Sequence, residues 1–197
     1  MWHRFTAEAS FLRSLVAIDE HLAEQVRARR CVRCEGPLHR GDYPRKPRGL
    51  PEGAEQAYWT RRSLCCGRCR KRSTPPSVRF LGRRVYVGWL VFVVVIRWSL
   101  AAGRIAGKQI AGVPRRTVRR WRGWWKGDFV ASDFWKAERA RFVPPPPEPA
   151  TMPLGFVDRF VGDEAQRLHF ALAFVAPITT ASASWVRVDL AHAEDGI

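Results

Sequence analysis

The chain has 197 residues, which suffices for one domain with a substantial core or for two small modules and excludes several large domains. It carries 34 Lys and Arg residues against 18 Asp and Glu residues, for a formal net charge of +16. Such a balance indicates a polyanionic partner, and nucleic acid is the default hypothesis. Compositional bias without any binding function is the alternative interpretation.

The charge is unevenly distributed along the chain. Residues 1–143 carry 31 basic and 11 acidic side chains, whereas residues 144–197 carry 3 and 7. No Asp or Glu occurs between Glu55 and Asp128, although 18 Lys and Arg residues lie there. Drift in composition would not remove every carboxylate from 72 consecutive residues, so this stretch is the expected polyanion-binding surface.

The first 30 residues predict an amphipathic helix. Leu12, Leu15, Val16, Leu22 and Val26 recur there at helical spacing among charged residues. A segment that is charged throughout differs from a cleavable secretion leader. We therefore expect a cytoplasmic, nucleoid-associated protein.

Five cysteines, at positions 31, 34, 65, 66 and 69, form two C-x-x-C pairs, CVRC and CGRC. Zinc prefers four soft ligands in a tetrahedron, and each C-x-x-C turn presents two thiolates to one ion. A disulfide framework is the alternative, which a cytoplasmic chain disfavours, and a thioredoxin-like redox pair is a weaker one. We expect one structural zinc ion per chain, with four thiolate ligands: Cys31, Cys34, Cys66 and Cys69.

Two residues near these pairs are ambiguous as ligands. Cys66, rather than Cys65, gives the C-x-x-C spacing with a glycine at the turn, so Cys65 is expected to be a spare buried thiol. His39 lies five residues after Cys34 and is an alternative ligand. The two pairs are farther apart than in a compact ribbon, and the intervening Gly41–Trp59 segment predicts a loop, because its first half is rich in Pro and Gly.

A basic stretch follows the second pair and surrounds the Pro75–Pro76 dipeptide. It suits an extended arm along a phosphate backbone, and a solvated linker is the equally weighted alternative. Arg79 lies within it. The predicted nucleic-acid contacts of this arm are Arg70, Lys71, Arg72, Arg83 and Arg84.

Val85–Ile96 is an apolar run of 12 residues, which predicts a buried helix or strand. A membrane span through Gly103 is the less favoured alternative.

Leu100–Trp125 then has the pattern of a helix-turn-helix. Its first helix would carry Ile105, Ala106 and Ile110; Gly112 permits a left-handed turn; Val113 fills the junction; and Pro114 suits the start of the second helix.

The second helix is expected to begin at Arg115 and to have two faces. Val118, Trp121 and Trp125 form an inward stripe, which leaves Trp124 without a clear place. The remaining face would enter a DNA groove, with Arg115, Arg116 and Arg119 reading bases and the others contacting the backbone. The predicted contacts are Arg115, Arg116, Thr117, Arg119, Arg120, Arg122 and Lys126.

The order CVRC, CGRC, a basic stretch and IAGVPRRTVRRW resembles the N-terminal DNA-binding regions of bacterial insertion-sequence transposases, which join a zinc ribbon to a helix-turn-helix. CCGRCRKRSTPPSVRFLGRRVYVG is also similar to small accessory proteins of such mobile elements. The resemblance covers residues 31–126. Transposases with this front end cut DNA with a carboxylate triad that holds two metal ions. Only 71 residues follow Lys126, and no strand pattern surrounds the carboxylates there, so none is assigned as catalytic: Asp158, Asp163, Glu164 and Asp189.

The rest of the chain predicts short helices. Ser132 or Asp133 would cap a helix that ends near Phe142, Val143–Pro153 reads as a stiff Pro-rich linker, and Gly162 or Asp163 would open a last helix. This last helix either supplies a dimer or partner surface or completes the main core. The predicted divisions are a helix (1–30), a zinc ribbon with basic arm (31–84), a helix-turn-helix domain (85–142), a linker (143–153) and a small helical module with a tail (154–197).

The expected fold is mainly α with a small zinc-bound β-ribbon and a helix-turn-helix. The expected function is non-enzymatic binding of duplex DNA by a bacterial mobile-element protein, without membrane association. A DNA-binding subunit that assists a separate catalytic protein of a nuclease or transposase complex is the second class. An RNA-binding zinc-ribbon protein is the third.

Overall fold

The computed structural model describes residues 2, 5, 7–54, 56–81, 85–101, 109–110, 112–144 and 149–180. The chain forms two compact units. Unit 1 comprises Met1–Thr6 and Trp89–Ala171, and unit 2 comprises Ala7–Gly88 and Leu172–Ile197. The described residues are mainly helical, with six α-helices and three small antiparallel sheets, as the sequence predicts in outline. No helix within the described ranges is both long and apolar enough to cross a membrane.

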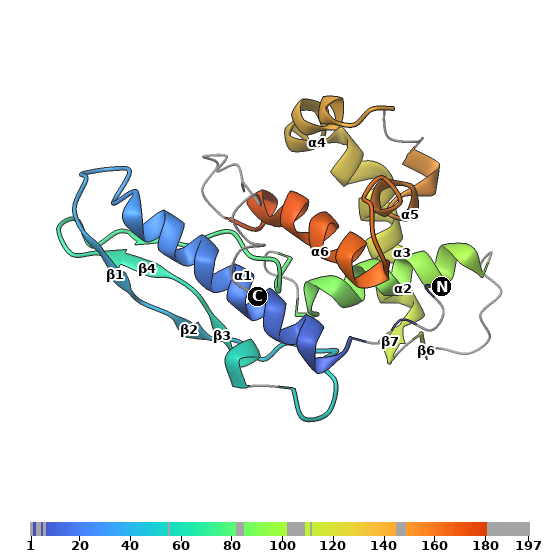
Figure 1. The fold of residues 1–197 in the computed structure, drawn as a ribbon, viewed down its shortest axis with the longest axis horizontal. Helices are drawn as coiled ribbons and strands as arrows, with labels where there is room; N and C mark the ends of the chain where they lie inside the picture. The colour runs from blue at the N-terminus through green and yellow to red at the C-terminus, as the bar shows by residue number, and fades with distance from the viewer. Residues whose placement is uncertain are drawn as a thin grey trace. The chain divides into compact units, whose positions relative to one another are not determined.

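Unit 2 begins with α1 (Ala9–Ala28), which confirms the predicted amphipathic helix. Its buried side chains recur every three or four residues and therefore lie on one face. They are Phe11, Leu12, Leu15, Asp19, Leu22 and Ala23. Figure 1 shows α1 beside the strands of the ribbon, of which β1 contacts it.

Three short strands form the main sheet of unit 2, in the order β1 (Leu38–Arg40), β4 (Leu64–Cys66) and β5 (Arg72–Ser73). A second sheet pairs β2 (Tyr43–Pro44) with β3 (Thr60–Arg61), and η1 (Gln56–Trp59) precedes β3. The predicted loop between the two cysteine pairs is therefore partly ordered by β2 and η1. Tyr58 of η1 is fully buried, and its hydroxyl donates to the carbonyl of Leu12 at 3.1 Å.

A buried ion pair joins α1 to the segment after β5. The Nε atom of Arg79 lies 2.7 Å from Oδ2 of Asp19, and both side chains are at most 1% exposed. Asp19 also accepts hydrogen bonds from the Ser77 hydroxyl at 2.6 Å and the Val78 amide at 2.7 Å. Residues 75–81 are buried, so this part of the basic stretch does not form the exposed arm that the sequence suggests.

Ion pairs on the surface of unit 2 connect α1 with the strands. Glu20 pairs with both Arg40 and Arg62, and Arg40 also approaches Glu24 at 3.3 Å. Arg62 pairs in addition with Asp42 at 2.6 Å. These carboxylates are therefore neutralised by arginines of their own unit.

Unit 1 is built from helices and turns. Its elements begin with α2 (Gly88–Leu100), whose first residue ends the first stretch of unit 2. The elements that follow are β6 (Gln109–Ile110), β7 (Val113–Pro114), α3 (Arg115–Trp124), the π-helical turn η2 (Trp125–Phe129), α4 (Asp133–Glu138), η3 (Arg139–Arg141), η4 (Pro149–Thr151), α5 (Leu154–Val157) and α6 (Glu164–Val175). The last turns of α6 and the following η5 (Ala176–Thr179) belong to unit 2. From Gly88 onward the apolar run of 85–96 is thus a buried helix, one of its predicted forms, whereas Val85 before the helix is exposed.

The region predicted as a helix-turn-helix has a different first half. Its second helix, α3, begins at Arg115 as predicted. Gln109–Ile110 pairs with Val113–Pro114 as an antiparallel hairpin, and Gly112 in its turn has a φ of 74°. Ile110 is therefore in a strand and not in a first helix, because the tight turn at Gly112 and β-branched residues on both sides favour a hairpin. The other residues assigned to that helix, Ile105 and Ala106, lie outside the described residues.

Aromatic rings fill the core of unit 1. The ring of Trp125 lies 4.6 Å from Phe92 of α2 and 4.8 Å from Phe129, and Phe156 of α5 lies 5.7 Å from Trp135. Trp124, which the sequence left without a place, is half-buried, with its ring 4.8 Å from that of Trp125.

The predicted helix starts in the C-terminal half are confirmed. The hydroxyl of Ser132 accepts from the amide of Trp135 at 3.2 Å and so caps α4. Before α6, Asp163 and Gln166 each accept a hydrogen bond from the other's backbone amide at 2.9 Å, which is a capping box. Met152 of the predicted linker is buried, so part of that segment belongs to the core.

Candidate metal centre and basic surface

The two C-x-x-C pairs converge into one cluster, as the sequence predicts. The Sγ atoms of Cys31, Cys34, Cys66 and Cys69 all lie within 4.8 Å of one another. The pairs Cys31–Cys69 and Cys34–Cys66 are separated by 3.6 and 3.5 Å. A disulfide would require about 2.05 Å, whereas four thiolates at 2.3 Å from one zinc ion lie about 3.8 Å apart. The cluster therefore fits one metal ion such as zinc.

The two C-x-x-C turns, here called the first knuckle (Cys31–Cys34) and the second knuckle (Cys66–Cys69), share a backbone feature. The residue after each pair, Glu35 or Arg70, adopts a left-handed conformation with a φ of 56° or 60°. In the second knuckle, the amides of Arg68 and Cys69 point at Sγ of Cys66, each at 3.4 Å. Amides directed at a sulfur stabilise a thiolate, so the turn is preorganised for a cation.

Gly36 makes room for this arrangement. A Cβ atom at this position would lie 2.9 Å from Sγ of Cys66 and 2.8 Å from Cβ of Arg68. The first knuckle can therefore approach the second only because residue 36 has no side chain. Within the described part of the chain, these four cysteines form the one cluster of His, Cys, Asp or Glu side chains that could hold a metal ion.

The four thiols differ in their proton affinities. The pKa of Cys66 falls to about 6, mainly because the amide of Cys69 donates to its sulfur. The amide of Lys71 lowers the pKa of Cys69, but burial and the neighbouring sulfurs outweigh it and raise this pKa to about 11. The second turn thus favours the thiolate form of Cys66, whereas Cys69 must release its proton when a cation binds.

The two ambiguous residues lie outside the sulfur cluster. Cys65 follows Leu64 on β4 and is half-buried, with its Sγ 3.6 Å from the carbonyl oxygen of Arg70. Since successive side chains of a strand alternate between faces, Cys65 and Cys66 point in opposite directions. His39 is exposed and pairs with Cys65 across the sheet, and its Nε2 would be 2.8 Å from a Cβ at Gly67. His39 therefore packs against the second knuckle.

The second candidate surface is the outer side of α3. Val118, Trp121 and Trp125 are at most 2% exposed, which confirms the predicted inward stripe. Arg116, Arg119 and Arg120 are exposed on the other side. Among the described residues, no carboxylate forms an ion pair with these three arginines, in contrast to the arginines of unit 2 that pair with α1.

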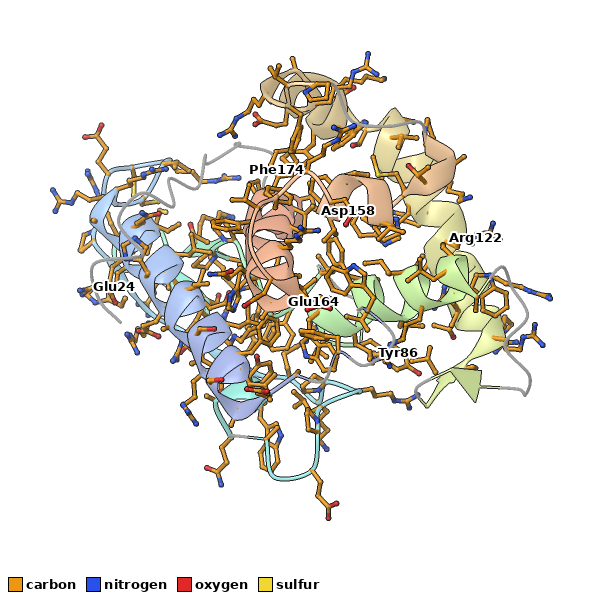
Figure 2. All side chains as sticks on the ribbon, turned by 45° about the vertical axis from the view of Figure 1, so that its right-hand side comes forward. Glu24, Tyr86, Arg122, Asp158, Glu164 and Phe174 are labelled. Atoms are coloured by element: carbon orange, nitrogen blue, oxygen red, sulfur yellow. The ribbon has the colours of Figure 1, made fainter. Side chains whose placement is uncertain are left out.

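The other predicted contacts of α3 lie at the borders of this face. The guanidinium of Arg115 lies 5.0 Å from the centre of the Trp98 ring, so α2 holds it. Arg122, labelled in Figure 2, and Thr117 are half-buried. Lys126 is also half-buried, and burial together with the charge of Arg122 lowers its pKa.

The contacts predicted for the basic stretch fall into three groups. Arg70 and Lys71 are exposed directly after the second knuckle. The Nη1 atom of Arg72 donates to the Gly41 carbonyl and to the Ser63 hydroxyl, at 2.5 and 2.9 Å, so this guanidinium is used within the sheet. Two lie outside the described residues: Arg83 and Arg84.

No family model, curated protein or solved structure matches this chain.

Proposed function

We propose that this protein binds duplex DNA through the outer face of α3, with no catalytic role of its own. The observation that carries the proposal is the division of α3 into a buried Val and Trp stripe and an exposed arginine face. A helix fixed to an aromatic core presents its charges in a defined geometry. The major groove of DNA admits one α-helix, and arginine is the commonest reader of guanine there.

The charges on this face favour DNA over a partner with mixed charge. Arg116, Arg119 and Arg120 have no carboxylate among the ten residues of α3 to compete for them. Arg116 and Arg119 are assigned to base contacts and Arg120 to the phosphate backbone. Arg115, which is held over Trp98, is better suited to a phosphate at the edge of the groove than to base reading.

The cysteine cluster has a structural part in this proposal. Zinc, when bound, supplies a cross-link between two segments that are 31 residues apart in sequence. Cys31 and Cys34 would hold it from one side and Cys66 and Cys69 from the other. The exposed Arg70 and Lys71 then follow a fixed turn, which suits them for phosphate contact.

The biological setting follows from the resemblance to transposase front ends. We propose that the target is the end of a mobile element or a promoter within it, in the bacterial nucleoid. A separate catalytic protein would carry out any strand cleavage. Binding to structured RNA is the competing outcome.

The proposal is tested with the zinc-loaded full-length protein. Selection from a random duplex pool gives a candidate site, and fluorescence anisotropy then compares this duplex, a scrambled duplex and a structured RNA at several salt concentrations. The test variant replaces Arg116, Arg119 and Arg120 with Gln. The matched control replaces Lys136, Arg139 and Arg141 with Gln, which removes the same charge from exposed positions of α4 and η3.

We expect the α3 variant to lose specific binding and the control to retain it. Each base-reading arginine should contribute about 1 to 3 kcal/mol on the selected duplex alone. Each lost phosphate contact should reduce the slope of log K against log salt by about 0.9. Equal binding by both variants, or a preference for RNA, would contradict duplex recognition by α3. Cleavage of DNA by the protein alone with magnesium would contradict the absence of a catalytic role.

A further inference from the structure

Trp59 differs from the other tryptophans of the described chain in its exposure. It is 55% exposed, whereas Trp124 is half-buried and the rest are at most 7% exposed: Trp2, Trp89, Trp98, Trp121, Trp125 and Trp135. It ends η1, directly before β3. Its neighbour Tyr58 is fully buried and bonded to α1, so the backbone at this position is fixed while the indole faces solvent.

A short basic segment runs beside Trp59. The amide of Arg45 donates to the carbonyl of Trp59 at 2.6 Å, which continues the pairing of β2 with β3. At the other end of the segment, Arg48 donates to the carbonyl of Val85 at 2.7 Å and accepts from the amide of Val87 at 3.1 Å. Residues 45–48 are therefore held between Trp59 and Val85.

The side chains of this region combine apolar surface with positive charge. Val85 is 53% exposed, and Lys46 and Arg48 are both exposed on the segment between it and Trp59. Arg45 is half-buried, with its guanidinium 5.3 Å from the centre of the Phe80 ring. Asp42, at the start of β2, is bound by Arg62 and by the amide of Ser63, so it does not neutralise this segment.

An exposed indole, on a strand pair whose neighbouring segment carries two exposed cations, matches the chemistry of an unpaired nucleotide. A base stacks on the ring regardless of its sequence, and the flanking phosphates need only charge and reach. A paired base inside a duplex has both faces covered and cannot stack in this way. An apolar protein segment would use the indole but would leave Lys46 and Arg48 without counter-charge.

We propose that Trp59 is a stacking platform for an unpaired base of the bound nucleic acid, with Lys46 and Arg48 on the adjacent phosphates. This inference rests on the proposed function, because it assigns a second contact to the same ligand. It adds a preference that α3 does not explain, namely for nucleic acid that carries an unpaired segment.

The test compares two probes that share the selected duplex. One is blunt, and the other carries a long single-stranded tail with 2-aminopurine within it. Zinc-loaded wild-type protein should bind the tailed probe more tightly and should quench the 2-aminopurine fluorescence. Trp59→Ala should lose about 5- to 150-fold on the tailed probe, the equivalent of one stacked base. Trp59→Phe should retain most of the affinity and the quenching.

Three controls separate stacking from other effects. All Trp59 variants should bind the blunt duplex within about twofold of wild type, since α3 is unchanged. Val85→Ala removes exposed apolar area without a ring and should leave the quenching intact. Glu52→Gln removes an exposed carboxylate from the same loop region and should not weaken binding.

The outcomes distinguish this inference from the proposed function. Equal binding of both probes by wild type and Trp59→Ala, with a tight blunt complex, overturns the stacking platform and leaves duplex binding in place. An equal loss on both probes overturns it too, because the residue would then support the fold or the duplex contact. No binding of either probe at low salt overturns both proposals.

Discussion

The buried carboxylate of Asp19 should be the most sensitive single position in unit 2. Asp19 is the charged partner of Arg79 and is 0% exposed. Arg61 is 2% exposed, and burial lowers its pKa, although the nearby charge of Asp19 opposes this shift. Asp19→Asn removes the charge while keeping nearly the same volume. The single remaining oxygen cannot serve both Val78 on one side and Ser77 with Arg79 on the other.

The expected loss is about 3 to 5 kcal/mol in the free energy of unfolding, because breaking one side of a buried ion pair leaves an uncompensated charge. Urea unfolding of zinc-loaded protein, followed by far-UV circular dichroism, would show a midpoint lower by about 1 to 2.5 M. This conversion uses the usual dependence of the free energy of unfolding on urea concentration, the m-value. The matched control is Glu20→Gln, one residue along α1. Its side chain is 32% exposed, so its loss should be under about 1 kcal/mol. A loss of less than 1 kcal/mol for Asp19→Asn would refute the reasoning.

Four further predictions concern the metal centre and α3. Glu35→Gly should raise the free energy of unfolding by about 1 kcal/mol, because a φ of 56° strains a residue other than glycine. Gly36→Ala should lower the zinc content measured by mass spectrometry, because the added Cβ would meet the sulfur of Cys66. An unchanged zinc content in Gly36→Ala would contradict the close approach of the two knuckles. Zinc affinity, measured by chelator competition, should rise about tenfold per pH unit between pH 6.5 and 8 for each proton released on binding. Cys69, with its pKa of about 11, must release a proton, whereas Cys66, with its pKa of about 6, is largely ionised already. A flat pH profile would argue against thiolate ligation. Gly123→Ala should raise the free energy of unfolding in urea by about 1 kcal/mol, because alanine favours the helix over glycine. The added carbon would meet no atom within 4 Å on the exposed side of α3. A destabilised variant would place that side of α3 in the core.

Local signals were sufficient for much of this fold. The C-x-x-C spacing fixed all four members of the cluster, because each turn needs only four consecutive residues to present two sulfurs. Pro114 gave the start of α3, and Ser132 gave the cap of α4. These features depend on residues that are close in sequence, where backbone preferences and hydrogen-bonding reach are decisive.

Long-range pairing was the part that local patterns missed. Arg79 appeared to belong to an exposed basic arm, but its partner Asp19 lies 60 residues away in sequence. A signal was present: Asp19 falls four residues after Leu15 and three before Leu22, on the apolar stripe of α1. A carboxylate at a core position requires a buried partner. The two-residue strands β6 and β7 were missed because so short a strand has almost no hydrophobic periodicity.

The order of the segments in the two units has a practical consequence. Unit 2 is formed by two stretches of chain, and residues 89–171 of unit 1 are inserted between them. The ends of this insertion meet: a Cβ atom built on Gly88 would lie 3.2 Å from Cδ2 of Leu172. Across the same junction, the amide of Ser77 donates to the hydroxyl of Thr179 at 2.9 Å. A short peptide joining Gly88 to Leu172 should therefore excise the arginine-bearing helix and leave unit 2, with its cysteine cluster, as one continuous chain. Truncation after Gly88 would instead remove the second stretch of unit 2.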